Sequence, residues 1–245
     1  MRKPIGYFIE TTSVIDGSPI VLIITLKSRN DKTGNMIQTW IMRSDLDPLS
    51  AVVQGLDRAI CGDCCHRPSL CHEMSAAPCY VTVFHAPLNI YRAYRRGRYV
   101  RWDKSLASLR ALVGRELRIG SYGDPCAVRE ALWTEVLEAL RPRRWSGYTH
   151  LWRETYAQWA RKWVMASVNS RWERTMAKLA GWRTFRVSRH EDERLPGRRE
   201  FHCPASDAGG NRLKCIDCTA CDGTHGRFVA VIDVEPMGDV TIYSH

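Results

Sequence analysis

Four cysteines late in the sequence have the spacing expected of a metal site. They fall within nineteen residues, and the last three form a C-x-x-C-x-x-C motif: Cys203, Cys215, Cys218 and Cys221. Gaps of two residues let neighbouring thiolates turn toward one point. Four thiolates with no histidine among them suit an iron–sulfur cluster or a tetrahedral zinc ion, and both stay open. Two disulfides among such close neighbours would be strained, so we expect a metal centre in this loop.

A second group of cysteines lies between residues 61 and 79. It holds five cysteines and two histidines: Cys61, Cys64, Cys65, His66, Cys71, His72 and Cys79. Thiolates and imidazoles at such short spacing are typical metal ligands, so this group also predicts metal binding. Because the cysteines of this 245-residue chain cluster in two places, they favour metal binding in a reducing cytoplasm over a disulfide-stabilised secreted fold.

The charge of the chain predicts a polyanionic partner. The formal net charge is +10 and the isoelectric point is about 9.3. Residues 92–118 hold nine arginines and lysines against two acidic residues, a density that attracts nucleic acid. The side chains expected to contact phosphates are Arg92, Arg95, Arg96, Arg98, Arg101 and Arg110. A solvated basic surface without a partner is the alternative.

No segment of the sequence has the pattern of a membrane anchor or a secretion signal. The longest apolar run, residues 20–26, has only the length of a strand. The first residues are basic but lack the apolar stretch of a signal peptide. We therefore expect a cytoplasmic protein without membrane contact.

The order of strand and helix patterns predicts an α/β fold in two parts. Residues 1–46 contain three apolar runs joined by turn-forming residues, which predicts an antiparallel β-meander. Residues 47–235 alternate short strands with helices, which is typical of parallel βαβ units and favours a partial or complete parallel β/α barrel. Within this domain the cysteine groups at 61–79 and 203–221 are expected to form metal-binding loops. Residues 236–245 are expected to be a C-terminal tail.

Finer expectations concern individual elements of the barrel-like domain. Residues 47–60 predict one helix, because an aspartate and a proline at its start precede a helical spacing of apolar residues. Residues 80–84 and 228–234 predict strands. The helix expected at 171–180 should bury an apolar face made of Trp172, Met176 and Leu179.

Polar residues follow several of the expected strands. Gly123, Asp124 and Pro125 come after one strand, and His150 and Asn169 come at the ends of the next two. Because ligands of parallel α/β folds bind at the carboxyl ends of strands, we expect these residues to face one site. A helix cap or a satisfied loop residue is the alternative for each residue alone.

Seven short motifs resemble those of an uncharacterised family of phage and plasmid proteins. The resemblance implies that the protein is phage- or plasmid-encoded, and it implies no activity. The motifs stand at Cys61–Arg67, Cys79–Val81, Tyr122–Pro125, Gly147–Trp152, Ala166–Ser170, Gly181–Val187 and Cys203–Cys221.

More remotely, the arrangement resembles radical S-adenosylmethionine (SAM) enzymes. These enzymes are β/α barrels in which three cysteines after an early strand hold a 4Fe–4S cluster, whose fourth iron binds SAM. The resemblance implies that Gly123, Asp124 and Pro125 contact SAM and that His150 and Asn169 line the substrate pocket. It also implies two sets of cluster ligands, a first set of Cys61, Cys64 and Cys79 and an auxiliary set of Cys203, Cys215, Cys218 and Cys221.

Two functional hypotheses follow from these observations. The first is an iron–sulfur enzyme of radical SAM type with an unknown substrate. The second is a non-catalytic nucleic-acid-binding protein stabilised by zinc, which the first group could hold through Cys61, Cys64, Cys79 and either His66 or Cys71. The gaps of two and fourteen residues between the first three cysteines differ from the C-x3-C-x2-C of most radical SAM enzymes, so iron and zinc both stay open.

Overall fold

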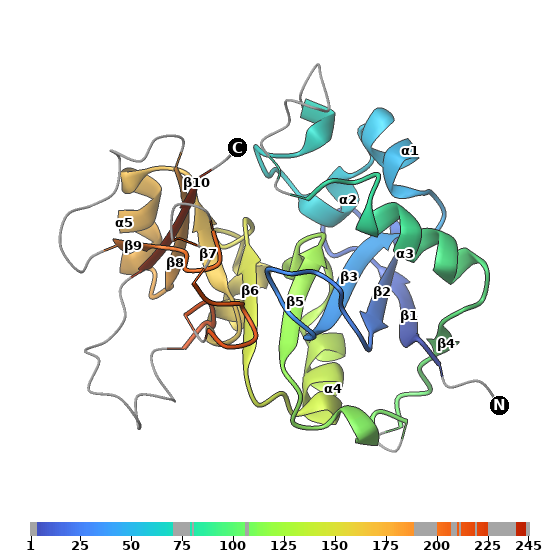
Figure 1. The fold of residues 1–245 in the computed structure, drawn as a ribbon. Helices are drawn as coiled ribbons and strands as arrows, with labels where there is room; N and C mark the ends of the chain where they lie inside the picture. Colours follow the sequence, from blue (N-terminus) through green and yellow to red (C-terminus); the bar gives the residue numbers. More distant parts are fainter. Residues whose placement is uncertain are drawn as a thin grey trace.

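Within the described residues of this computed structural model, ten strands form one sheet in the order β4-β1-β2-β3-β5-β6-β7-β8-β10-β9 (Figure 1). The structure describes residues 4–70, 79, 81–105, 108–188, 200–206, 210, 212–218, 220–224 and 239–243. Helices lie against this sheet, which confirms the α/β class. Within the described ranges, no helix is long and apolar enough to cross a membrane.

The expected N-terminal meander is confirmed. Strands β1 (Gly6–Thr12), β2 (Pro19–Thr25) and β3 (Ile37–Arg43) pair antiparallel in sequence order. In β2 every residue after Pro19 is buried, because an uninterrupted apolar run fits a strand that is covered on both faces. The turn between β1 and β2 is closed by Asp16, whose Oδ1 accepts a hydrogen bond from Ser18 N over 2.9 Å.

The strands that follow β3 in the sheet are parallel, and from β5 to β8 they lie in chain order. β3 pairs with β5 (Leu117–Tyr122), followed by β6 (Trp145–Thr149), β7 (Met165–Val168) and β8 (Thr184–Ser188). Successive βα units wound in one direction produce this order. The meander and the parallel part are therefore joined in one sheet through the β3–β5 pair.

The described strands form an open sheet, and the partial or complete barrel that the alternation of elements favoured is not confirmed. The second edge of β3 is occupied by β2, so the parallel strands cannot close onto it. β4 (Val100–Arg101) lies at one edge of the sheet, beside β1. At the other edge, β10 (Asp239–Tyr243) lies between β8 and β9 (Glu200–His202). Residues 239–243, which were expected in a tail, are thus a strand.

The helix expected over residues 47–60 is two helices, α1 (Pro48–Val53) and α2 (Arg58–Cys61). Its start is as predicted, since Asp47 accepts hydrogen bonds from Leu49 N and Ser50 N. The break coincides with Gly55, whose φ of 70° is incompatible with a continuing helix. This break sets Cys61 at the end of a short second helix beside β3.

Three further helices flank the sheet: α3 (Ala86–Arg95), α4 (Glu130–Leu140) and α5 (Arg171–Leu179). Short 3₁₀ helices lie at Pro68–Leu70, Arg110–Leu112, Pro125–Ala127 and Thr155–Lys162. In Figure 1, α1, α2 and α3 gather beside β1–β3, whereas α5 lies beside β7 and β8.

Two expectations about these elements are wrong in the described residues. Trp172, Met176 and Leu179 do not point inward: they are 65%, 40% and 78% exposed. α5 instead buries Ala177, whose small side chain allows a close approach to the sheet. Residues 81–84 form a bend and a turn, not a strand. The strand expected at 228–234 lies outside the described residues.

Candidate functional site

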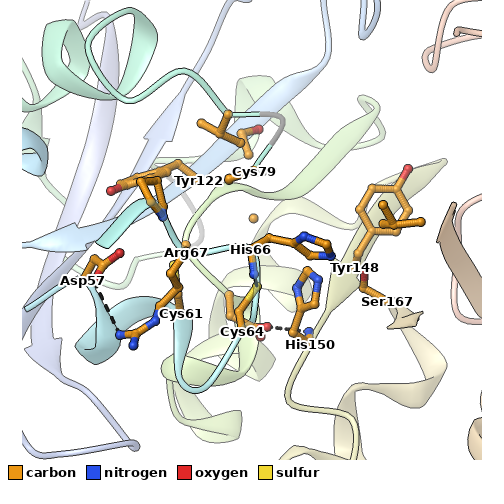
Figure 2. Close-up of a pocket in the computed structure, with 17 residues that line it drawn as sticks. Asp57, Cys61, Cys64, His66, Arg67, Cys79, Tyr122, Tyr148, His150 and Ser167 are labelled. Carbon is orange, nitrogen blue, oxygen red and sulfur yellow. Dashed lines mark hydrogen bonds and ion pairs between the residues drawn. The ribbon is translucent and has the colours of Figure 1, made fainter. Parts of the chain in front are cut away.

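A small cavity of about 90 Å³ lies at the carboxyl edge of the parallel strands. The ends of β5–β8 contribute to its wall, and so do α2 and the loop that follows it (Figure 2). Thiols, imidazoles and carboxyl groups meet there: Cys61, Cys64, Cys79, His66, His150, Asp57 and Asp124. The structure thus brings both sequence regions expected to form the site to one place.

Three thiols of the first cysteine group line this cavity. Cys61 ends α2, and Gly62 follows with a φ of 59°, which turns the chain toward Cys64. A Cβ at Gly62 would lie 2.4 Å from Cδ2 of Leu151, so the turn requires glycine. Burial is the main cause that raises the pKa values of all three thiols. The pKa of Cys61 rises well above its usual value, the pKa of Cys64 rises to about 12, and the pKa of Cys79 also rises. These thiols therefore stay protonated at neutral pH unless a cation displaces the proton.

The remaining cysteine that can be placed in this group lies at the surface. Cys65 is exposed, and its sulfur accepts a hydrogen bond from Nδ2 of Asn169 over 3.4 Å. Cys71 and His72 lie outside the described residues. Over the described part of the chain, no group of three or more cysteine, histidine, aspartate or glutamate side chains is arranged to hold a metal ion. The three thiols share a cavity without forming a finished coordination shell.

The carboxylate of Asp124 links the ends of β5 and β6 by hydrogen bonds. Its Oδ1 accepts hydrogen bonds from Cys126 N (2.9 Å) and Thr149 Oγ1 (2.8 Å), and its Oδ2 accepts one from His150 N (2.7 Å). Burial nevertheless raises the pKa of this carboxyl to about 6, against the effect of the three donors. The bonds give Asp124 a structural role at the cavity, and its contact with SAM stays a prediction.

The neighbours of Asp124 in the sequence shape the same rim. Gly123 has a φ of 75°, and a Cβ there would lie 2.5 Å from the carbonyl oxygen of Ile41. Pro125 begins the 3₁₀ helix that Asp124 caps. Gly123 and Asp124 line the cavity, whereas Pro125 lies behind it, where its carbonyl accepts from Nε1 of Trp133 over 2.8 Å.

His150 and Asn169, the expected substrate-pocket residues, are connected through His66. The rings of His66 and His150 lie 5.5 Å apart, edge to face, and Nε2 of His66 lies 2.5 Å from Oδ1 of Asn169. Burial, with a smaller effect of His66, lowers the pKa of His150 to about 3, so this ring is neutral at physiological pH. Within the described residues, Nδ1 of His66 and Nε2 of His150 have no hydrogen-bond partner. These two ring nitrogens are available to a bound molecule.

Sequence reasoning missed a buried ion pair in the same wall. Arg67 and Asp57 lie 3.4 Å apart, with 9% and 1% of their side chains exposed (Figure 2). Asp57 Oδ1 also accepts from Ser69 Oγ over 2.6 Å, and burial raises the pKa of the carboxyl. The motif Cys61–Arg67 includes Arg67, but nothing in the sequence pairs it with Asp57, which lies ten positions earlier at the start of α2.

The C-terminal cysteines pack against β6–β8. Cys203 follows β9, and Cys203, Cys218 and Cys221 pack against a small core of Met165, Phe185 and Ala220. Burial first, and then Cys203 and Cys218 nearby, raise the pKa of the Cys221 thiol well above its usual value. Two backbone bonds anchor the loop, from Cys215 N to Lys32 O (2.8 Å) and from Gly147 N to Cys221 O (3.1 Å).

The basic segment has charged side chains at the surface and aromatic side chains in the core. Arg92, Arg95, Arg96, Arg98 and Arg101 are all exposed on α3 or shortly after it. Arg101 forms an ion pair with Glu10, and Arg95 donates to Ser44 O over 3.3 Å. The aromatic residues that could have stacked on bases are mostly buried: Tyr91, Tyr99 and Trp102 are at most 7% exposed.

Comparisons of this chain with protein-family models, with curated proteins and with solved structures found no match.

Proposed function

We propose that the protein is an iron–sulfur enzyme of radical SAM type, with a 4Fe–4S cluster bound by Cys61, Cys64 and Cys79. One observation carries the proposal: these three thiols, spread over nineteen sequence positions, line a single cavity at the carboxyl edge of a parallel sheet. Three cysteine ligands leave one iron of such a cluster open. The alternation of strands and helices around the cavity supports the same fold relationship, a partial β/α barrel.

The donor set fits this cofactor. Soft sulfur ligands select iron–sulfur clusters or zinc over hard cations, and ligation would convert the buried neutral thiols into thiolates. When bound with SAM, the cluster supplies the electron for its reductive cleavage. Cys203, Cys215, Cys218 and Cys221 are proposed to hold a second metal centre. Cysteines that bind metal and form no disulfides, as proposed for both groups, suit a reducing cytoplasm.

The protein side chains around the three cysteines have separate proposed tasks. Asp124 and the Gly123 backbone fix the rim where SAM would bind, and Oδ2 of Asp124, which accepts one bond from His150 N, keeps a lone pair for an amino group. Nε2 of His150, neutral and without a described partner, is placed to hydrogen-bond a substrate. Asn169 orients His66 through its side-chain oxygen.

Anaerobic purification followed by iron, sulfide and zinc analysis tests the proposal. Iron and acid-labile sulfide should be present, and the reduced protein should form 5′-deoxyadenosine from SAM. Cys64→Ala should lose the first cluster and all SAM cleavage. Cys65→Ala is the matched control, since Cys65 is the exposed neighbour and should change neither property. Colourless protein that contains zinc, or equal losses in both variants, would refute the assignment.

The exposed arginines of α3 favour a second candidate function, nucleic-acid binding by a zinc-stabilised protein. Arg92, Arg96 and Arg98 project from one short stretch and are exposed, as phosphate-binding side chains need to be. This function requires zinc in the cysteine groups and salt-dependent binding to DNA or RNA.

A further inference from the structure

A second, larger cavity lies beside the one that the first three cysteines line. Its volume is about 320 Å³, and the two cavities share Val81, Ser121 and Tyr148 in their walls. Cys203 and Cys215 of the C-terminal group also line it. The larger cavity therefore lies between the two cysteine groups, and its volume is within the range of small-molecule sites.

The charge of this cavity favours an anion. Arg118 on β5 is only 6% exposed and lines the cavity. Its guanidinium carbon lies 4.4 Å from the ring centre of Tyr148, and its Nη1 donates to Ser146 Oγ over 3.4 Å. Lys32 adds a second cation where the wall is exposed. Since no described lining residue is an aspartate or a glutamate, an anionic ligand is the complement of this wall.

The apolar part of the wall consists of aromatic rings. Trp40, Tyr148 and Phe185 line the cavity, and the last two rings stack with centres 4.0 Å apart. The indole nitrogen of Trp40 already donates to Thr25 Oγ1 over 3.1 Å, so this ring presents apolar surface. Such walls fit a flat ring, which stacks on aromatic side chains at low entropic cost.

Two polar side chains complete the recognition surface. Gln38 is held in place by bonds from its Nε2 to Ser28 Oγ (2.6 Å) and to Thr33 Oγ1 (2.8 Å). The buried hydroxyl of Ser121 has no hydrogen-bond partner within the described residues. A buried group of this kind gains from a ligand that supplies the missing partner.

We propose that this cavity binds a small organic anion that carries a flat ring. Arg118 receives the anionic group, and Trp40 and Phe185 receive the ring, since Arg118 and Phe185 already lie against the ring of Tyr148. The assignment of this molecule as the substrate rests on the enzyme function proposed above, because it would lie against the cavity of Cys61, Cys64 and Cys79. The binding itself does not depend on that function.

Calorimetric titration of the purified protein tests the binding with two charged probes, benzoate for a carboxylate and adenosine monophosphate for a phosphate. The neutral counterparts are benzamide and adenosine, and inorganic phosphate reports on the bare anion. At least one charged ring should bind saturably, about tenfold or more tightly than its neutral counterpart, because a hydrogen bond to a charged group is lost. Failure of both charged probes to bind, or equal affinity for charged and neutral rings, overturns the proposal.

Two pairs of variants locate the binding. Arg118→Gln should weaken it about tenfold or more, whereas Arg129→Gln, at an exposed arginine outside the cavity, should leave it unchanged. Because Arg118 is buried and its variant could fail to fold, Ala86→Trp blocks the cavity from an exposed lining position, and Asn89→Trp on the same helix is its control. Unchanged affinity in Ala86→Trp overturns the assignment.

The same preparation separates this proposal from the enzyme function. Anion binding without 5′-deoxyadenosine formation supports the cavity assignment and removes the enzyme function. SAM cleavage without anion binding supports the enzyme function and removes the assignment of the larger cavity as an anion site.

Discussion

Asp124 shows how one side chain can organise two strand ends. Its carboxylate accepts from Cys126 N, Thr149 Oγ1 and His150 N, and its own backbone N–H donates to Ile60 O over 2.6 Å. The residue therefore connects β5, β6 and the end of α2 in one network. From sequence, the resemblance to radical SAM enzymes implied a cofactor contact for Asp124, whereas its position after a strand predicted only a residue at a site or a helix cap.

We predict that the ionisation of Asp124 makes the protein less stable as the pH rises from 4 to 7. Its pKa of about 6 in the folded protein exceeds the ordinary 3.8, so the folded state binds the proton more tightly. This stabilisation is complete below pH 4 and is lost as the pH rises through 6, by ~3 kcal/mol in total. The unfolding free energy of the wild type minus that of Asp124→Asn should fall by this amount in denaturant titrations.

Asp103→Asn is the control for this titration. Hydrogen bonds from Ser105 lower the pKa of Asp103, so its contribution changes only below about pH 4. A difference curve for Asp124→Asn as flat as that for Asp103→Asn between pH 4.5 and 7 would contradict the prediction.

At the scale of elements, periodicity predicted most of the strands and helices but not their breaks or their outward faces. The meander, β5 and α3 follow from apolar alternation and helix-start signals, which are local properties of the sequence. The end of α1 at Val53 and the outward face of α5 depend on the tertiary packing of these helices, which the spacing of apolar residues does not encode. The convergence of Cys61, Cys64 and Cys79 was expected only from family motifs, because the fourteen-residue gap has no intrinsic geometry.

We predict that Gly62→Ala destabilises the protein more than Gly55→Ala. Both glycines have positive φ angles, 59° and 70°, but only a Cβ at Gly62 meets another atom, 2.4 Å away on Leu151. Gly55→Ala should therefore cost the backbone strain alone, ~1 kcal/mol, and Gly62→Ala at least ~1–3 kcal/mol more through the clash. Thermal unfolding of both variants checks the order. Equal losses of stability in the two variants would contradict the prediction, because the turn between Cys61 and Cys64 would then accommodate the added Cβ without a clash.

At the scale of the whole molecule, the net charge of +10 does not by itself identify a partner. Part of the positive charge is neutralised locally, as in the pairs Arg43–Asp45, Arg101–Glu10 and Arg143–Glu116. The exposed arginines of α3 are thus a better guide to a binding partner than the net charge of the whole chain. The sequence could predict the charge but not its distribution over the folded surface.

We predict that any binding to single-stranded DNA weakens with salt and depends on the exposed arginines of α3 and of the residues directly after it. Replacement of both Arg92 and Arg96 by glutamine should reduce the slope of log affinity against log salt by about 1.4, since each phosphate contact on single strands contributes about 0.7. Fluorescence anisotropy with a labelled oligonucleotide measures this slope. The control replaces the exposed Arg129 and Arg141. Equal effects of the two pairs would show that only total charge matters.

The position of β10 sets an order of events during synthesis. Among the described strands, β9 pairs with β10 alone, and β10 comes about forty residues later in the chain. The segment with Cys203, Cys215, Cys218 and Cys221 therefore leaves the ribosome before the strand that holds its start in the sheet. Until residues 239–243 have been made, these four thiols lack that support. Oxidants and competing metals reach them most easily in this interval, so the metal centre proposed for these four cysteines is expected to be loaded last.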